Sequence, residues 1–227
     1  MGKDNKTAEF LAMSPMGKVP VLETPKGAIF ESNAIARYVA RIRADTELTG
    51  ASFFQKAQVD SWVDFCSLEL ELPSTLLIYP ILGYMEHNAA MYNKAKGDLH
   101  KALAVLDAHL TDNTFLVGNS VTLADIVCVT ALFYPFKMVL DTEVQAKFSA
   151  VTRWFVTCVN QPQFASVLGD VPLCRTAMAP AGAAAGGKGK KGGKKEAKKA
   201  EKKAKKAKEE ADKKAKEEAD KKAKEEA

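Results

Sequence analysis

Hydrophobic and polar positions near the amino terminus first alternate and then change period. Val19 and Val21, and later Ala28 and Phe30, stand at every second position, which is the spacing of two short β-strands. The residues between them, 24–27 (TPKG), predict a tight turn, because proline presets φ and glycine tolerates a positive φ. Two strands alone are marginal in water, so the pattern raises the question of where the rest of the sheet lies.

Helical spacing flanks this hairpin. Residues 6–13 predict a short helix before it, and a second helix begins at Ser32 with one apolar face. That face consists of Ile35, Tyr38, Val39 and Ile42. The amino-terminal stretch is therefore predicted to be a small α/β piece.

From residue 53 onward the apolar positions follow helical spacing only. Ser52 and Gln55 form a capping-box pattern that predicts a helix through about residue 72, which we expect Pro73 to end. Its apolar stripe consists of Val59, Val63, Cys66 and Leu70. A second long helix is predicted over about residues 90–110, with Leu99, Leu103, Leu106 and Leu110 at the same spacing.

A second capping box, Thr122 with Asp125 in the place of glutamate, precedes a helix that is apolar nearly all round. A helix of that kind is typical of the centre of a bundle. Further helices are predicted over about residues 144–159 and from Pro162. The fold class predicted from the pattern is α/β followed by an all-α domain.

The charge of the chain is unevenly distributed. The 227 residues carry a formal net charge of +5, but residues 188–227 alone contain 18 Lys and 10 acidic residues. The remaining residues are therefore mildly acidic, with a net charge of −3. The tail follows a Gly/Ala/Lys linker and repeats the octapeptide ADKKAKEE, so we expect a solvated helix or a helix–coil mixture there.

Cysteine and histidine positions offer no metal site. The four cysteines contain no CxxC pair, which favours free thiols in a reducing compartment, and His87, His100 and His109 form no ligand motif. No signal-peptide pattern opens the chain, and the longest uninterrupted apolar stretch, between Asp125 and Pro135, is too short to span a bilayer. We therefore expect a cytoplasmic protein without membrane insertion.

Three motifs together carry a family resemblance. Residues 17–20 (GKVP), the pair Glu31-Ser32 at a helix start and the Thr122–Asp125 box resemble the cytosolic glutathione transferases. In that family a thioredoxin-like domain precedes an all-α domain. With its Lys-rich extension, the chain resembles more specifically the gamma subunits of the eukaryotic translation elongation factor one B complex.

The resemblance implies four segments. Residues 1–45 would be a partial thioredoxin-like domain, 46–52 a connector and 53–176 the all-helical transferase domain, followed by the linker and tail over 177–227. In the family about fifty residues precede the first helix seen here, and they carry the catalytic residue and the central strand. A compact domain would also follow the Lys-rich linker. On this resemblance we expect a chain that is shortened at both ends.

The resemblance also implies a glutathione site. The Val19–Pro20 bond would be cis, the backbone of Val19 would pair with the cysteinyl backbone of glutathione, and Glu31 and Ser32 would hold its γ-glutamyl end. A helix amino terminus independently offers free N–H groups and positive potential to a carboxylate. Lys18 would approach the glycyl carboxylate, or else be a solvated turn lysine. The alternative for Ser32 is a simple helix cap, and Thr122 and Asp125 are assigned a structural capping role.

Three functions follow as hypotheses. The first is a non-catalytic anchoring subunit of the elongation factor complex, whose transferase-like body docks the nucleotide-exchange subunit. The second is an S-transferase that uses glutathione or a related thiol, although neither a catalytic residue nor a metal or other cofactor is assigned. The third is contact of the basic tail with RNA, the ribosome or another polyanion, since lysine blocks favour polyanions through counterion release. A homodimer remains open.

Overall fold

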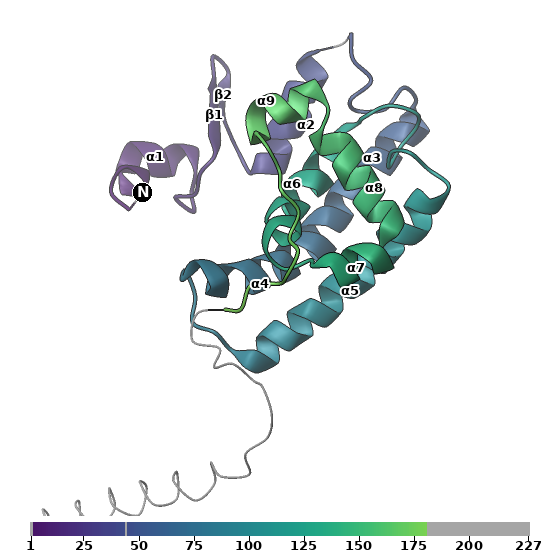
Figure 1. Ribbon diagram of the computed structural model, residues 1–227. Coiled ribbons are helices and arrows are strands. Elements are labelled where there is room, and N and C mark those ends of the chain that lie inside the picture. The colour runs from purple at the N-terminus through teal and green to yellow at the C-terminus, as the bar shows by residue number, and fades with distance from the viewer. Residues whose placement is uncertain (1, 44, 181–227) are drawn as a thin grey trace, which may run out of the picture. The chain divides into compact units, whose positions relative to one another are not determined.

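The computed structural model describes residues 2–43 and 45–180. Residues 1, 44 and 181–227 lie outside the described part, and with them most of the predicted linker and all of the Lys-rich tail. The described residues form a hairpin-containing segment followed by helices, as Figure 1 shows. The predicted order of an α/β piece and an all-helical domain is confirmed.

The predicted hairpin is present but starts two residues later than the alternation indicated. Strands β1 (Val21–Thr24) and β2 (Gly27–Phe30) pair antiparallel, with Val21 opposite Phe30. The turn is closed by the hydroxyl of Thr24, which donates to the carbonyl of Gly27 at 2.7 Å. Gly27 adopts a φ of 132°, which explains why glycine stands there.

Helix α1 (Ala8–Met13) precedes the hairpin and begins later than the predicted residue 6. The reason is local, because the Thr7 side chain accepts a hydrogen bond from the N–H of Phe10 and so caps the helix at Thr7. Residues Asp4–Lys6 form a separate 3₁₀ turn. The predicted helix is thus confirmed with a corrected start.

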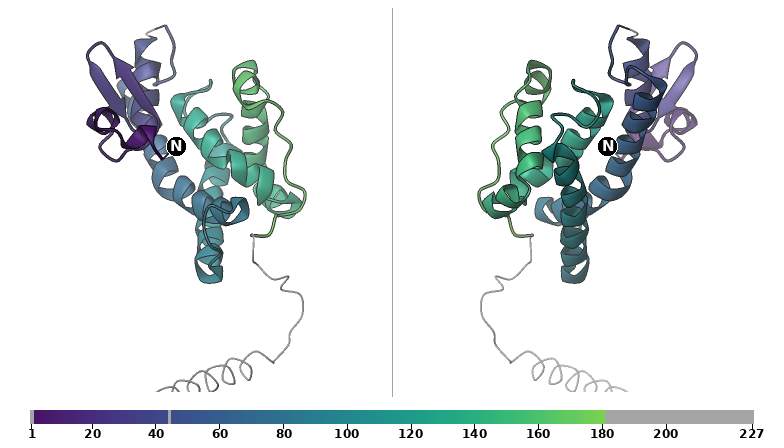
Figure 2. Two further views of the ribbon diagram at one scale, coloured as in Figure 1. Left: turned by 90° about the vertical axis from the view of Figure 1, so that its left-hand side faces the viewer. Right: turned by 90° about the vertical axis from the view of Figure 1, so that its right-hand side faces the viewer.

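Helix α2 (Ser32–Ile42) follows the hairpin, as predicted, and packs against both strands. Its predicted apolar face is only partly covered. Ile35 is half-buried, whereas Val39 is 49% exposed and Ile42 is 61% exposed. The two described strands, which Figure 2 shows beside α2, are too few to cover this face, and Val39 and Ile42 stay largely in contact with solvent.

The prediction that Pro73 ends the next helix is wrong. Helix α3 (Phe53–Phe65) passes through a π-helical segment (Cys66–Glu71) directly into α4 (Leu72–Leu82). Pro73 directly follows the π-helical segment, and the helix continues through it because the wider π turn accommodates a residue that cannot donate a regular helical hydrogen bond. The helix ends only at Gly83, which adopts the left-handed conformation at the carboxyl end.

Counted through from Phe53 to Leu82, this helix is long and apolar enough to cross a membrane by length and composition alone. The same test is passed by core helices of soluble proteins, so it is weak support for a membrane span. Here the helix contributes buried side chains to the core, among them Val59, Val63, Leu70 and Leu77.

The two central helices match their predictions. Helix α5 (Ala89–Thr111) buries Leu99, Leu103, Leu106 and Leu110, the four leucines of the predicted stripe. Helix α6 (Leu123–Met138) is buried on nearly every side and packs against α2, α3, α4 and α8. It therefore lies at the centre of the bundle, as its uniformly apolar sequence indicated.

One predicted helix is two helices. The stretch over residues 144–159 forms the end of α7 (Thr142–Lys147) and α8 (Ser149–Val159), which are separated at Phe148. Phe148 is buried and has φ and ψ of −111° and 62°, outside the helical region. Helix α9 (Pro162–Leu168) begins at Pro162, as predicted.

Candidate functional site

The Val19–Pro20 turn is built on the buried side chain of Ser14. The Ser14 hydroxyl donates to the carbonyl of Lys18 at 2.9 Å and accepts from the Lys18 N–H at 3.2 Å. The next peptide bond, Val19–Pro20, is cis, as the family resemblance implies. Within the described residues the backbone N–H and carbonyl of Val19 have no hydrogen-bond partner. This turn therefore presents a free donor and a free acceptor to solvent.

The hairpin register brings the predicted site residues to one end of the sheet. Val21 pairs with Phe30, so the chain that precedes Val21 and the chain that follows Phe30 leave the sheet at the same end. Val19 lies two residues before β1 and Ser32 two residues after β2, so both stand at this end of the sheet.

Glu31 occupies an unusual backbone conformation. It has a φ of 69° and is the one residue other than glycine with a positive φ in the part of the chain that the structure describes. A positive φ costs about 1–3 kcal/mol for such a residue and often marks a functional position. The Glu31 carbonyl accepts from the N–H of Ile35, so this residue is also the N-cap of α2.

Ser32 is not the cap of α2, and the simple capping alternative is wrong for it. It is the first residue inside the helix, and the N-cap position belongs to Glu31, whose side chain makes no capping hydrogen bond. The first N–H groups of α2 are therefore not satisfied by a capping side chain. They leave a positively polarised helix end at the same end of the sheet as the Val19 turn, and such an end is suited to a carboxylate.

All five predicted site residues, Lys18, Val19, Pro20, Glu31 and Ser32, are exposed. The main cavities of the described body lie between helices instead, for example one of about 170 Å³ between α4 and α6. The arrangement is thus an open edge rather than an enclosed pocket. It can pair with an extended peptide backbone and hold a carboxylate.

The cysteines do not supply a reactive thiol to this edge. Cys66, Cys128, Cys158 and Cys174 are all buried and unpaired. Burial raises the pKa of Cys158 to about 12, and the pKa of Cys128 is also raised by the neighbouring Cys66 and by burial. A thiol with a raised pKa is mostly protonated and so a weak nucleophile.

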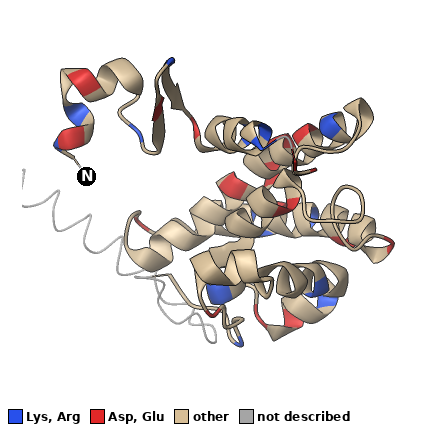
Figure 3. Cartoon of the chain, turned by 90° about the horizontal axis from the view of Figure 1, so that it is seen from above, with Lys and Arg blue, Asp and Glu red and all other residues tan. Residues whose placement is uncertain are grey.

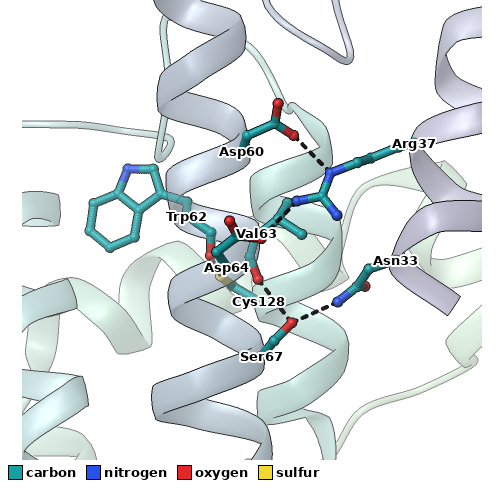
Figure 4. Close-up of polar contacts among 8 residues, drawn as sticks. All are labelled: Asn33, Arg37, Asp60, Trp62, Val63, Asp64, Ser67 and Cys128. Atoms are coloured by element: carbon teal, nitrogen blue, oxygen red, sulfur yellow. Dashed lines mark hydrogen bonds and ion pairs between the residues drawn. The ribbon is translucent and has the colours of Figure 1, made fainter. Parts of the chain in front are cut away.

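A polar seam, defined by Asn33, Arg37, Asp60, Asp64 and Ser67, fastens α2 to the helical body (Figure 4). The Arg37 guanidinium donates from Nε to Asp60 at 2.7 Å and from Nη2 to Asp64 at 2.9 Å. The amide of Asn33 donates to the hydroxyl of Ser67 at 2.8 Å. Sequence reasoning missed this seam, although the spacing of Asp60 and Asp64 places both carboxylates on one face of α3.

Thr122 and Asp125 form a complete capping box at the start of α6. Asp125 is fully buried and accepts hydrogen bonds from the N–H and hydroxyl of Thr122, the N–H of Leu116 and the indole of Trp154. A buried carboxylate needs such partners, since leaving it unpaired is costly. The hydrogen bonds of Asp125 therefore hold the start of α6 to α8 and to the loop before α6.

Comparison with known proteins identifies related families. The model of the glutathione S-transferase N-terminal domain matches residues 1–41, and that of the C-terminal domain matches residues 65–162. The crystal structure of the GST-like domain of elongation factor 1-gamma from Saccharomyces cerevisiae matches with a TM-score of 0.68 and 26% identity. That match covers 76% of this chain and 82% of the yeast chain. The predicted fold class, a transferase-type α/β piece with a helical domain, is confirmed.

Curated relatives are more similar in sequence. The chain is 49% identical over 171 residues to probable elongation factor 1-gamma 1 of Arabidopsis thaliana, over 75% of this chain and 41% of that protein. It is 45% identical over 174 residues to elongation factor 1-gamma-A of Xenopus laevis, over 76% and 39% respectively. The chain thus spans about two fifths of the length of these relatives.

Proposed function

Since this chain belongs to the elongation factor 1-gamma family, we propose that it is a non-catalytic structural subunit of a translation elongation factor complex. In this role its transferase-like body anchors the assembly by docking the nucleotide-exchange subunit. The observation that carries the proposal is the 49% identity to an elongation factor 1-gamma over 171 residues. The solved GST-like domain with a TM-score of 0.68 supports it independently at the level of the fold.

The geometry at the hairpin edge favours binding over catalysis. The free backbone of Val19 and the start of α2 at Ser32 hold a peptide backbone and a carboxylate in place. Conjugation needs in addition a group that stabilises a thiolate at the sulfur. The groups described at this edge recognise the ends and backbone of a ligand, so glutathione or a related thiol is the ligand we assign to it.

An S-transferase is the second candidate function, favoured by the cis Val19–Pro20 bond and the strained Glu31. The test is the conjugation of glutathione to a chlorodinitrobenzene, which is followed by the absorbance of the conjugate. Turnover above background that is lost in the double variant Glu31→Ala and Ser32→Ala would support the enzyme and contradict the anchoring proposal. Binding of glutathione without turnover would support a site that only binds.

Docking is tested by retrieval of the exchange subunit. The full chain, a chain lacking residues 188–227, and residues 188–227 fused to a carrier are compared at low and physiological salt. We expect the first two to retrieve the subunit equally, because the tail is separated from the body by a Gly-rich linker. Retrieval by the tail alone would show that the body is not the docking module.

The proposal extends to the tail and to assembly. Residues 188–227, with a net charge of +8, make salt-sensitive contacts with RNA, the ribosome or other polyanions in this proposal. Deletion of the tail should weaken those contacts and leave exchange-subunit binding unchanged. We also assign the protein to the cytoplasm. Whether the full chain forms a homodimer is tested by sedimentation equilibrium.

A further inference from the structure

A small cavity of about 120 Å³ lies where the end of α2 faces the start of α3. Arg41, Thr49, Lys56 and Asp60 are among the residues that line it. The cavity opens beside the residues that precede α3, away from the hairpin edge that holds the candidate thiol site. The cavity thus lies towards the carboxyl end of α2, whereas the candidate thiol site lies at its amino end.

The charge of this cavity is positive and partly uncompensated. Asp60 is engaged by Arg37 in the seam, so its charge is already neutralised. Arg41 and Lys56 have no ion-pair partner among residues 2–43 and 45–180. The cavity thus offers two cations whose charge no described carboxylate neutralises. Figure 3 shows that the two signs are otherwise interspersed along the helices.

Two exposed aromatic side chains stand at the start of α3, the helix that carries Lys56. Phe53 is 91% exposed and Phe54 is 74% exposed, at the first two positions of α3. The Lys56 ammonium lies 5.5 Å from the centre of the Phe53 ring, which ties Phe53 to the charged cavity, and Phe54 is the next residue on α3. Neighbouring large aromatic side chains in full contact with water are characteristic of interaction surfaces, where burial of each contributes to binding.

We propose that Arg41, Phe53, Phe54 and Lys56, here called the cationic–aromatic surface, dock an acidic segment of a partner protein with an aromatic or aliphatic anchor. Carboxylates of the segment pair with Arg41 and Lys56, and its anchor packs on the two phenylalanines. This inference rests on the proposed docking function and names the face of the body that performs it.

A protein segment fits this surface better than a nucleic acid. Nucleic-acid binding requires a track of basic residues that follows many phosphates. Here the cations are two, a carboxylate lies in the same cavity, and the whole described body is acidic. A short acidic segment matches two cations and two aromatic rings, whereas a nucleic acid needs a longer track of basic residues.

The experiment uses the full chain at physiological salt, so that the tail makes the same contribution in every variant. The probe is a short labelled peptide of aspartate and glutamate residues around one phenylalanine and one leucine. The test variants are Arg41→Glu with Lys56→Glu, and Phe53→Ala with Phe54→Ala. The matched control reverses two other exposed charges that have no ion-pair partner among the described residues, Lys96→Glu with Lys147→Glu. Binding is measured by fluorescence anisotropy, and hydrogen exchange locates the peptide.

We expect each test variant to weaken binding about tenfold and the control to change it less than about twofold. Peptide-dependent protection should map to residues 41–56. The inference would be overturned if the test variants bound the peptide as tightly as the unmodified chain does, or if the control lost as much affinity as the test variants. Protection of residues 41–56 by a labelled oligouridylate and not by the peptide would overturn it in favour of RNA.

The same variants separate this inference from the proposed function. If the full chain retrieves the exchange subunit and the test variants retrieve it equally well, the docking function stands and this surface is not its site. If the unmodified chain retrieves no exchange subunit, the docking function fails. The peptide measurement then still decides whether the surface binds acidic segments.

Discussion

The indole N–H of Trp154 on α8 donates a hydrogen bond of 2.9 Å to the carboxylate of Asp125 on α6, and both side chains are fully buried. Asp125 simultaneously holds Thr122 and Leu116. One carboxylate thus joins two helices and the loop before α6. Because each donor would otherwise be buried without a partner, the cluster acts as a unit.

Replacement of Asp125 by alanine should therefore lower the free energy of unfolding by about 3 kcal/mol or more, since hydrogen bonds to a charged group contribute about 1.5–3 kcal/mol each. The measurement is urea denaturation followed by circular dichroism. Asp112→Ala is the matched control, because Asp112 is exposed and should change the free energy by less than about 0.5 kcal/mol. Similar losses in both variants would contradict the assigned role.

A second carboxylate acts across helices. Oδ1 of Asp107 on α5 accepts from the N–H of Ala150 at 2.9 Å and from that of Val151 at 3.1 Å, and so caps the start of α8. We expect Asp107→Ala to lower the free energy of unfolding by about 1–2 kcal/mol, as the loss of a cap does. Asp107→Asn should retain much of the stabilisation that the cap provides. Thermal melts of the two variants and of the unmodified chain provide the test. A melting temperature of Asp107→Ala equal to that of the unmodified chain would disprove the cap.

This cap explains why one predicted helix is two. The apolar spacing of Val144, Phe148, Val151 and Phe155 is continuous, so period alone indicates one helix. The break at Phe148 depends on Asp107, far away in sequence, which satisfies the first N–H groups of α8. Local patterns carry no information about such a partner. The continuation of the helix past Pro73 likewise depends on a π-helical segment that has no sequence period.

The candidate site was predictable where it depends on local patterns, and not where it depends on contacts that form only in the folded chain. The hairpin and its turn fix the register, and the register brings Val19 and Ser32 to the same end of the sheet. The positive φ of Glu31 has no local signal, because glutamate does not favour that region. The seam at Arg37 was also not predictable, since it forms only when α2 packs on α3.

Cys158 makes stability depend on alkaline pH. Burial raises the pKa of its thiol to about 12, whereas an unfolded cysteine titrates near 9. Above pH 9 the unfolded chain loses this proton and the folded chain keeps it, so the free energy of unfolding falls as pH rises from 9 towards 12. The slope is at most about 1.4 kcal/mol per pH unit for one thiol. Below pH 9 the group contributes no pH dependence.

Urea denaturation between pH 8 and 10.5 measures this slope, and Cys158→Ala serves as the comparison. In the variant the free energy of unfolding should decline less steeply as pH rises. Any difference between the two proteins at pH 8 reflects the lost packing of the side chain and not its titration. In the same pH range the native chain should resist alkylation by iodoacetamide at this position and react only when unfolded. Parallel slopes in both proteins would mean that Cys158 is not responsible.

Local stability should differ along the chain. The segment over residues 1–45 contains a two-stranded sheet and a helix, α2, whose apolar face is largely exposed. Few buried contacts and solvent-exposed backbone hydrogen bonds predict low free energies of local opening. We expect amides of β1 and β2 to exchange in seconds to minutes, while those of α6 and α8 exchange only by global unfolding. Uniform protection across residues 18–42 would contradict this expectation.

The seam gives the last prediction, because Arg37 connects this less stable segment to the bundle. Its guanidinium contacts two carboxylates, Asp60 and Asp64, and its side chain is 23% exposed. Partly exposed ion pairs of this kind contribute about 1 kcal/mol at most, so Arg37→Ala should leave global unfolding nearly unchanged. The loss should appear locally, as amide exchange in α2 that is about fivefold faster, with exchange in α6 unaffected.

A double-mutant cycle with Arg37→Ala and Asp60→Ala separates the ion pair from the packing of the arginine stem. We expect a coupling of about 0.5–1 kcal/mol in the opening free energy of α2, reduced by salt. Arg37→Lys retains the charge but not the fork that reaches both carboxylates, so it should recover only part of the protection. If exchange in α2 is the same in all of these variants, α2 is held by its contacts with α6 and the seam contributes nothing measurable.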